Sequence, residues 1–344
     1  MLKKIALEKL GDLVSALMER GPLYAPVKEE KAVDFKRIGK PSEVTLDFYN
    51  TAMSPKFVFF PQSEEMIRYK LGKDAAETVV PIDAPPSVIF GVRPCDAKSF
   101  AIMDRHFLGA GVIDPYWKEK REKTVVIGYA FDPETPPDPA DFYNTLGIHA
   151  ADTDGSDILI VRKEGRLLLQ GVTEKGEGLL KELSLLEAGS EQDEAAFAEA
   201  VKKGRDVKTR FTEIDDKAIA AKLVQIFEKK EFWEEKSAAC ISCGVCTFVC
   251  PTCYCFDIND ETLFREGARK RFWDACMFTD FTLEASGHNP RPKIFQRYRQ
   301  KACHKYSYHV TKYGCISCVG CGRCTRYCPV NIDIFSIVKD AAQL

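Results

Sequence analysis

Cysteine is the residue type that could do chemistry in this 344-residue chain, which has 14 of them, all but Cys95 between Cys240 and Cys328. One motif, Cys-x2-Cys-x2-Cys-x3-Cys-Pro, begins at Cys240 and again at Cys318. This run is typical of bacterial two-cluster ferredoxins, in which the first three thiolates hold one cluster and the fourth ligates the other. The spacing therefore predicts two [4Fe–4S] clusters.

The ligand sets follow from the exchange of the fourth cysteine between the two motifs. The predicted ligands of the first cluster are Cys240, Cys243, Cys246 and Cys328. Those of the second cluster are Cys318, Cys321, Cys324 and Cys250. Paired Cys-x2-Cys units also occur in zinc ribbons. A third cysteine at the same spacing, followed by Cys-Pro, favours the iron–sulfur interpretation.

Further cysteines lie outside both motifs and have two interpretations. Four of them stand in the segments GVRPCDA, CPTCYCFD and RFWDAC: Cys95, Cys253, Cys255 and Cys276. Each could be a small buried apolar residue, which is a common place for a free cysteine. Together they could instead ligate a third cluster at a domain boundary, since Cys95 opens a predicted helix, where the helix dipole favours a thiolate. We expect Cys303 and Cys315 to be inert.

Short apolar runs and helical spacing predict the elements that carry these cysteines. Runs rich in β-branched or aromatic residues predict buried strands at 57–60, 87–91, 124–128 and 158–161. Helical spacing covers 97–108 and 177–186, a helix capped by Ser190 ends near Gly204, and another helix covers 215–229. Mixed strands and helices favour an α/β or α+β arrangement over an all-β fold.

We expect two domains: an α/β partner-docking domain over residues 1–230 and an α-helical ferredoxin domain with two [4Fe–4S] clusters over residues 231–344. The segment between the two cysteine motifs is too long for a small ferredoxin. It contains two stretches with helical spacing, 262–272 and 292–306. That length and spacing resemble the helical ferredoxin modules of larger redox complexes.

Composition and motifs exclude several classes of function. The net charge is only −2, so the basic and aromatic segment 291–308 is interpreted as compensation for cluster charge, not as a nucleic-acid surface. No apolar run is long enough for membrane insertion, and the N-terminal segment predicts an amphipathic helix rather than a signal peptide. Dinucleotide, Walker and triad motifs are missing, so no catalytic residue is predicted. We expect a cytoplasmic protein.

The segments GVRPCDAKSFAIMDRHF, CISCGVCTFVCPTCYCFD, RFWDAC and CVGCGRCTRYCPV resemble a family that includes an iron–sulfur component of anaerobic sulfite reductase and the β subunit of sulfhydrogenases. The resemblance implies an iron–sulfur protein that relays electrons in an anaerobic complex, between an FAD- and NAD(P)H-binding subunit and a terminal catalytic subunit of hydrogenase, sulfite reductase or heterodisulfide-reductase type. Ferredoxin is a further partner that it implies. Many relatives carry extra cysteines after the strand that here ends at Gly128, whereas this chain has none there.

Two other functions stay open at this stage. One is a self-contained oxidoreductase that reduces a small acceptor at a third cluster or at a flavin in the N-terminal domain. The other is a nucleic-acid-binding protein with structural clusters.

Overall fold

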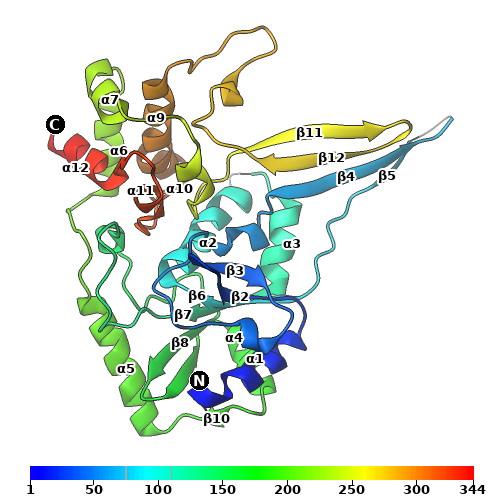
Figure 1. Cartoon of the computed structure of the whole chain (residues 1–344), viewed down its shortest axis with the longest axis vertical. Helices are drawn as coiled ribbons and strands as arrows, with labels where there is room; N and C mark the ends of the chain where they lie inside the picture. The colour runs from blue at the N-terminus through cyan, green and yellow to red at the C-terminus, as the bar shows by residue number, and fades with distance from the viewer. Residues whose placement is uncertain (74–75, 110) are drawn as a thin grey trace.

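An eight-stranded mixed sheet forms the centre of the N-terminal part of the molecule (Figure 1). The computed structural model describes residues 1–73, 76–109 and 111–344. The sheet has the spatial order β10-β1-β9-β8-β7-β6-β2-β3. Its strands are β1 (Leu2–Ala6), β2 (Leu23–Lys28), β3 (Val33–Arg37), β6 (Ser87–Val92), β7 (Thr124–Tyr129), β8 (Ile158–Lys163), β9 (Arg166–Gly171) and β10 (Glu187–Ala188). Strands β2, β6, β7 and β8 run parallel, and the other pairs are antiparallel.

Helices cover both faces of this sheet, so its central strands are buried on both sides. The helices of this half are α1 (Leu10–Met18), α2 (Pro94–Phe107), α3 (Pro115–Lys123), α4 (Glu174–Glu182) and α5 (Glu191–Asp206). Helices α1 and α4 pack on one face through Leu17 and Leu180, and α2 and α3 pack on the other through Phe100 and Trp117. The expected mixed α/β architecture is confirmed.

Most local predictions for this half are confirmed. The strands expected at 87–91, 124–128 and 158–161 are β6, β7 and β8. Ser190 and Asp193 form the capping box of α5: the Ser190 amide donates to Asp193 Oδ2 at 2.9 Å, and the Asp193 amide donates to Ser190 Oγ at 3.3 Å. The amphipathic N-terminal helix is only partly right, because residues 2–6 form β1 before α1 begins.

The strand expected at 57–60 is wrong, because Pro55–Val58 form a 3-10 turn. Pro55 pre-sets the first helical φ angle, and the Lys56 amide donates to Ser54 Oγ at 3.1 Å. The turn directs the rings of Phe59 and Phe60 into the core beneath α2. Aromatic content alone therefore indicated burial but not the backbone conformation.

Short helices form the C-terminal part, which lies above the sheet in Figure 1. They are α6 (Asp216–Gln225), α7 (Lys230–Ser237), α8 (Val245–Phe248), α9 (Ile294–Cys303), α10 (His309–Tyr313), α11 (Arg323–Arg326) and α12 (Ile334–Gln343). A π-helical turn, His304–Tyr308, joins α9 to α10. The helices expected at 215–229 and 292–306 are thus confirmed. Trp233, Tyr298 and Tyr306 are buried among these helices.

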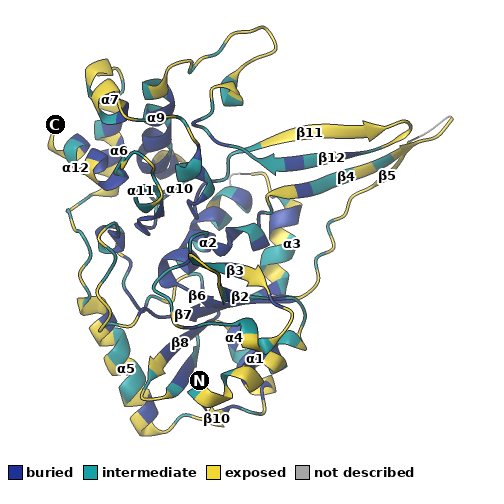
Figure 2. Ribbon diagram, viewed as in Figure 1, coloured by how far each residue is buried: buried dark blue, intermediate teal, exposed yellow. Residues whose placement is uncertain are grey.

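A second sheet, with the order β11-β12-β4-β5, extends away from the body as an arm whose outer strand is exposed (Figures 1 and 2). Its strands are β4 (Ser63–Leu71), β5 (Ala76–Val79), β11 (Phe256–Leu263) and β12 (Glu266–Trp273). The helix expected at 262–272 is therefore wrong. In the hairpin, Asp260 stands opposite Arg269, and the two side chains form an ion pair at 2.8 Å.

Strand β12 pairs with β4 from the N-terminal part, so the arm takes strands from both sides of residue 230. The domain boundary near that residue stays a prediction. Across residues 1–73, 76–109 and 111–344, no helix combines the length and the hydropathy needed to cross a membrane.

Candidate metal centre

The four cysteines predicted for the first cluster line one cavity: Cys240, Cys243, Cys246 and Cys328. Gly244, with φ of 75°, precedes α8 in the loop that carries the first three of them. A Cβ on Gly244 would lie 2.6 Å from the Phe278 ring, so only glycine fits. The amides of Ser242 and Ile332 donate to the sulfurs of Cys240 and Cys328 at 3.4 and 3.3 Å.

The four cysteines predicted for the second cluster line another cavity: Cys250, Cys318, Cys321 and Cys324. Its loop is pressed against the N-terminal part of the chain. Gly320 and Gly322 have φ of 61° and 66°, and a Cβ on Gly320 would lie 2.5 Å from the Tyr143 amide nitrogen. The Phe142 amide donates to the Gly320 carbonyl at 2.9 Å. The second cavity therefore lies at the junction between the two halves of the molecule.

The two cavities adjoin each other, because Cys324 and Lys301 line both. Their other walls are mainly apolar and include Met277 and Tyr298 in the first and Phe142 and Val319 in the second. Sulfur donors in apolar surroundings suit soft metals and iron–sulfur clusters rather than oxygen-seeking cations. The residues present thus fit a cluster in each cavity. Within the described ranges, no three His, Cys, Asp or Glu side chains are arranged around a single metal ion.

Three buried lysines lie among these thiols. The Lys305 ammonium is 3.2 Å from Cys250 Sγ, and Lys301 donates to the Cys246 carbonyl at 3.0 Å. Lys56, from the turn before β4, donates to the carbonyls of Cys250 and Cys253 at 2.8 and 2.9 Å. Buried cations offset the negative charge of thiolate-bound iron and raise its reduction potential. The basic stretch in the sequence anticipated Lys301 and Lys305, but no local signal indicated Lys56.

Burial and the thiols act in opposite directions on these lysines. Burial lowers the pKa of Lys56 to about 8, even though the neighbouring Cys253 and Cys250 favour its charged form. Burial also opposes the charge of Lys305, but Cys250 and Cys253 outweigh it and raise the Lys305 pKa above its ordinary value. The thiols of Cys250 and Cys253 therefore favour the protonated, charged form of Lys305.

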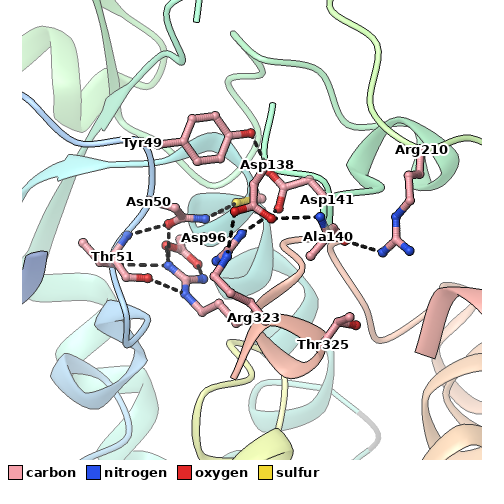
Figure 3. A network of polar contacts seen from close by, with 12 residues as sticks. Tyr49, Asn50, Thr51, Asp96, Asp138, Ala140, Asp141, Arg210, Arg323 and Thr325 are labelled. Atoms are coloured by element: carbon pink, nitrogen blue, oxygen red, sulfur yellow. Dashed lines mark hydrogen bonds and ion pairs between the residues drawn. The ribbon is translucent and has the colours of Figure 1, made fainter. Parts of the chain in front are cut away.

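A buried ion pair attaches the second motif to helix α2 of the N-terminal part (Figure 3). Arg323 of α11 donates to both carboxylate oxygens of Asp96 at 2.6 and 2.7 Å, and both side chains are fully buried. Arg323 also donates to the Thr51 carbonyl at 2.8 Å and to Asn50 Oδ1 at 2.6 Å. Sequence reasoning missed this pair, because Asp96 and Arg323 are 227 residues apart.

Asp141 lies beside that pair and packs against the second motif (Figure 3). It accepts from the Tyr49 hydroxyl at 2.5 Å and from Arg326 at 3.2 Å. Burial raises the pKa of Asp141 to about 6, although Tyr49 and Arg326 both stabilise its charged form. This carboxyl therefore titrates above the ordinary range of aspartate.

Cys95 does not accompany Cys253, Cys255 and Cys276, the other cysteines predicted for a third cluster. It is fully buried in a core cluster with Cys321, and Asn50 Nδ2 lies 3.9 Å from its sulfur. Burial is the main cause that raises the pKa of the Cys95 thiol. Cys303 is buried in the helical core, and Cys315 lies 3.7 Å from His309 Nδ1. None of these three lines the two thiol cavities.

Comparison with known proteins agrees with this geometry. The family described as "4Fe-4S dicluster domain" matches residues 239–332, which contain all eight motif cysteines. The C-terminal region is a 4Fe-4S dicluster domain. Such a domain holds two [4Fe–4S] clusters, so the two predicted clusters are confirmed, and the third cluster stays a prediction. The assignment of individual cysteines to each cluster stays a prediction.

Two curated proteins are similar to the chain that carries this dicluster domain. Sulfhydrogenase 2 subunit beta of Pyrococcus furiosus is 28% identical over 343 residues, which cover 99% of this chain and 98% of the relative. F420-dependent formate dehydrogenase subunit beta of Methanocaldococcus jannaschii is 27% identical over 126 residues, or 34% of this chain and 26% of the relative. No solved structure matches. Over nearly its whole length the chain is thus similar to a sulfhydrogenase β subunit, and its C-terminal region has the iron–sulfur motifs of electron-transfer proteins.

Proposed function

We propose that this chain relays electrons between an FAD- and NAD(P)H-binding subunit and a terminal catalytic subunit, in a cytoplasmic complex of anaerobic metabolism. The terminal subunit would be of hydrogenase, sulfite reductase or heterodisulfide-reductase type, and ferredoxin is a further partner. The observation that carries the proposal is the pair of adjoining thiol-lined cavities that share Cys324 and Lys301. Clusters bound there would supply one-electron storage at two neighbouring points.

The roles of the chain's own residues follow from the two cavities. Each motif contributes three thiolates to one cavity and its last cysteine to the other, so neither site can be completed by a single motif. Apolar walls exclude water, and the amides of Ser242 and Ile332 donate to ligand sulfurs, which stabilises negative charge there. Lys301, between the cavities, favours the reduced state of both sites.

Exposure distinguishes the two sites. Cys243 is exposed and Ile241, two residues before it, is 61% exposed, whereas Cys250 and Cys321 are buried. We infer that an external electron carrier approaches the first site, at Ile241 and Cys243. The arm offers a second contact surface, because Leu263 and Phe264 at its hairpin turn are 73% and 92% exposed. Exposed apolar side chains at such a point are suited to a partner subunit.

The ligand sets can be tested by iron and acid-labile sulfide analysis of anaerobically purified variants. Cys246→Ser and Cys328→Ser should each lose one cluster, about four iron atoms per chain. Cys303→Ser is the matched control, because this buried cysteine lies outside both motifs and should keep its full iron content. Unchanged iron in Cys246→Ser and Cys328→Ser, or colourless protein loaded with zinc, would overturn the proposal.

The relay itself is tested with the complex purified from its native host. The complex should pass electrons from NAD(P)H to its terminal acceptor, and Cys246→Ser should abolish this transfer while the flavin subunit still reduces an artificial dye. Terminal turnover at the wild-type rate in Cys246→Ser would show that electrons bypass the first site.

A cleft in the N-terminal sheet favours the second candidate function, reduction of a small acceptor by this chain alone. The cleft has a volume of about 490 Å³ and lies where β6, β7 and β8 end. Buried Arg93 reaches its wall, with its guanidinium 4.2, 4.5 and 4.9 Å from the ring centres of Phe48, Tyr129 and Phe131. Bound flavin, or turnover of an anionic acceptor by the purified chain, would support this function. If the purified chain neither binds flavin nor turns over an anionic acceptor, the electron-relay function is favoured.

A further inference from the structure

Three cysteines that the dicluster motif does not use gather at the base of the arm: Cys253, Cys255 and Cys276. The hairpin explains how they meet. Strand β11 begins directly after Cys255, β12 ends shortly before Cys276, and Phe256 pairs with Trp273. The Asp274 amide also donates to the Cys255 carbonyl at 2.9 Å. The return of the chain therefore places Cys255 and Cys276 at the same end of the hairpin, on either side of the Phe256–Trp273 pair.

The surroundings of these three thiols are buried and cationic. Cys253 Sγ lies 4.0 Å from the Lys301 ammonium, and Cys276 Sγ lies 3.7 Å from Thr247 Oγ1. Lys56 donates to the Cys253 carbonyl at 2.9 Å and lies 4.2 Å above the Trp273 ring. Cys253 is buried, and Cys255 and Cys276 are largely so.

The lysines lack the counter-charges that usually accompany buried ammonium groups. Lys56, Lys301 and Lys305 are only 2%, 3% and 5% exposed, and within the described part of the chain none of them pairs with a carboxylate. Burying a charge without a partner is costly, so three such cations together require nearby negative charge. The acidic groups that contact Lys301 and Lys305 are the thiols of Cys253 and Cys250, at 4.0 and 3.2 Å. Lys305 is thus beside a motif thiol, whereas Lys301 lies beside Cys253, and Lys56 donates to the Cys253 carbonyl at 2.9 Å.

We propose that Cys253, Cys255 and Cys276 hold a third iron–sulfur cluster through three thiolates, with one iron position that has no cysteine ligand. An all-sulfur, buried and electropositive site suits such a cluster better than zinc or an oxygen-liganded cation. Cys95 is not a ligand, because it packs beside Cys321 in the second site. The ligand claim is independent of the relay function. Only the role of the third cluster depends on that proposed function. In the relay, it would be an additional electron-transfer site between the arm and the dicluster domain.

Iron analysis separates this proposal from the dicluster assignment. Anaerobically purified wild type should contain about 12 iron atoms per chain, or about 11 if the unligated iron is lost. Cys255→Ser and Cys276→Ser should each fall to about 8, and Cys255→Ser combined with Cys246→Ser should fall to about 4. Cys303→Ser should equal the wild type. A wild-type content of about 8 that Cys276→Ser leaves unchanged would overturn the third site while leaving the two motif sites intact.

A spectroscopic measurement on the wild type gives a second readout, and the two variants assign its signal. Brief air oxidation should remove the unligated iron and give the wild type the EPR signal of an oxidised three-iron cluster, and this signal should be missing in Cys255→Ser and present in Cys303→Ser. No such signal, together with two thiols that become titratable only after reduction, would show that Cys255 and Cys276 form a disulfide. That result would refute the proposed cluster.

Discussion

Replacing Arg323 by methionine removes the cation from the buried pair that joins the second cysteine motif to α2. Asp96 would keep its carboxylate in a site with no exposure and would lose both of its bonds, at 2.6 and 2.7 Å. Removing one partner of a buried pair costs roughly 3–5 kcal/mol. With a urea m value of about 3 kcal/mol/M, the unfolding midpoint should fall by about 1–1.7 M.

The assay is urea unfolding of the anaerobically purified protein, followed by tryptophan fluorescence. Arg20→Met is the control, since it breaks an exposed pair with Glu182 that is worth less than about 1 kcal/mol. Adding Asp96→Asn to Arg323→Met should recover part of the loss, because the stranded charge is then gone. A loss below about 1 kcal/mol in Arg323→Met would refute the reasoning, as it would mean that water or another cation reaches Asp96.

Three further outcomes are expected. Lys301→Met should lower the potentials of the motif sites in a redox titration by roughly 60 mV, a tenfold change for one electron. Replacement of the exposed Lys339 of α12 by methionine should not. Because burial raises the pKa of Asp141 from 3.8 to about 6, the folded state keeps this proton longer than the unfolded state. The free energy of unfolding should therefore fall as pH rises from about 4 to 6. In urea unfolding at each pH, Asp141→Asn should not show this fall. The same pH dependence in the wild type and in Asp141→Asn would contradict the assignment. Phe264→Asp at the arm's turn should reduce copurification of partner subunits at unchanged iron content, and full recovery of the complex would exclude the arm as a docking surface.

Cysteine spacing was sufficient to predict which thiols share a cavity, because each motif acts over a few residues. The loop after Cys240 and the loop after Cys318 both depend on local turns and on glycine. Helix α9 and the Ser190 capping box were predictable for the same reason, since their signals lie within one or two turns.

Contacts between distant segments could not be predicted. Lys56 donates to the Cys250 carbonyl from 194 residues upstream, and no periodicity in either segment predicts this contact. The segment 262–272 has helical spacing, yet β4 was available to pair with β12. A partner strand almost 200 residues away decided the conformation.

The arm also means that the C-terminal cysteine motifs cannot be separated from the N-terminal part of the chain. Its β12 lies between β11 and β4, and Arg271, buried on β12, forms ion pairs with Glu64 and Asp114. A fragment that starts at residue 231 would keep all eight motif cysteines but would strip this strand of its neighbour and leave a guanidinium without anions. The cysteine motifs therefore do not form a unit that can be moved alone. Transferring them to another protein would also require strand β4 and the two carboxylates that pair with Arg271, those of Glu64 and Asp114.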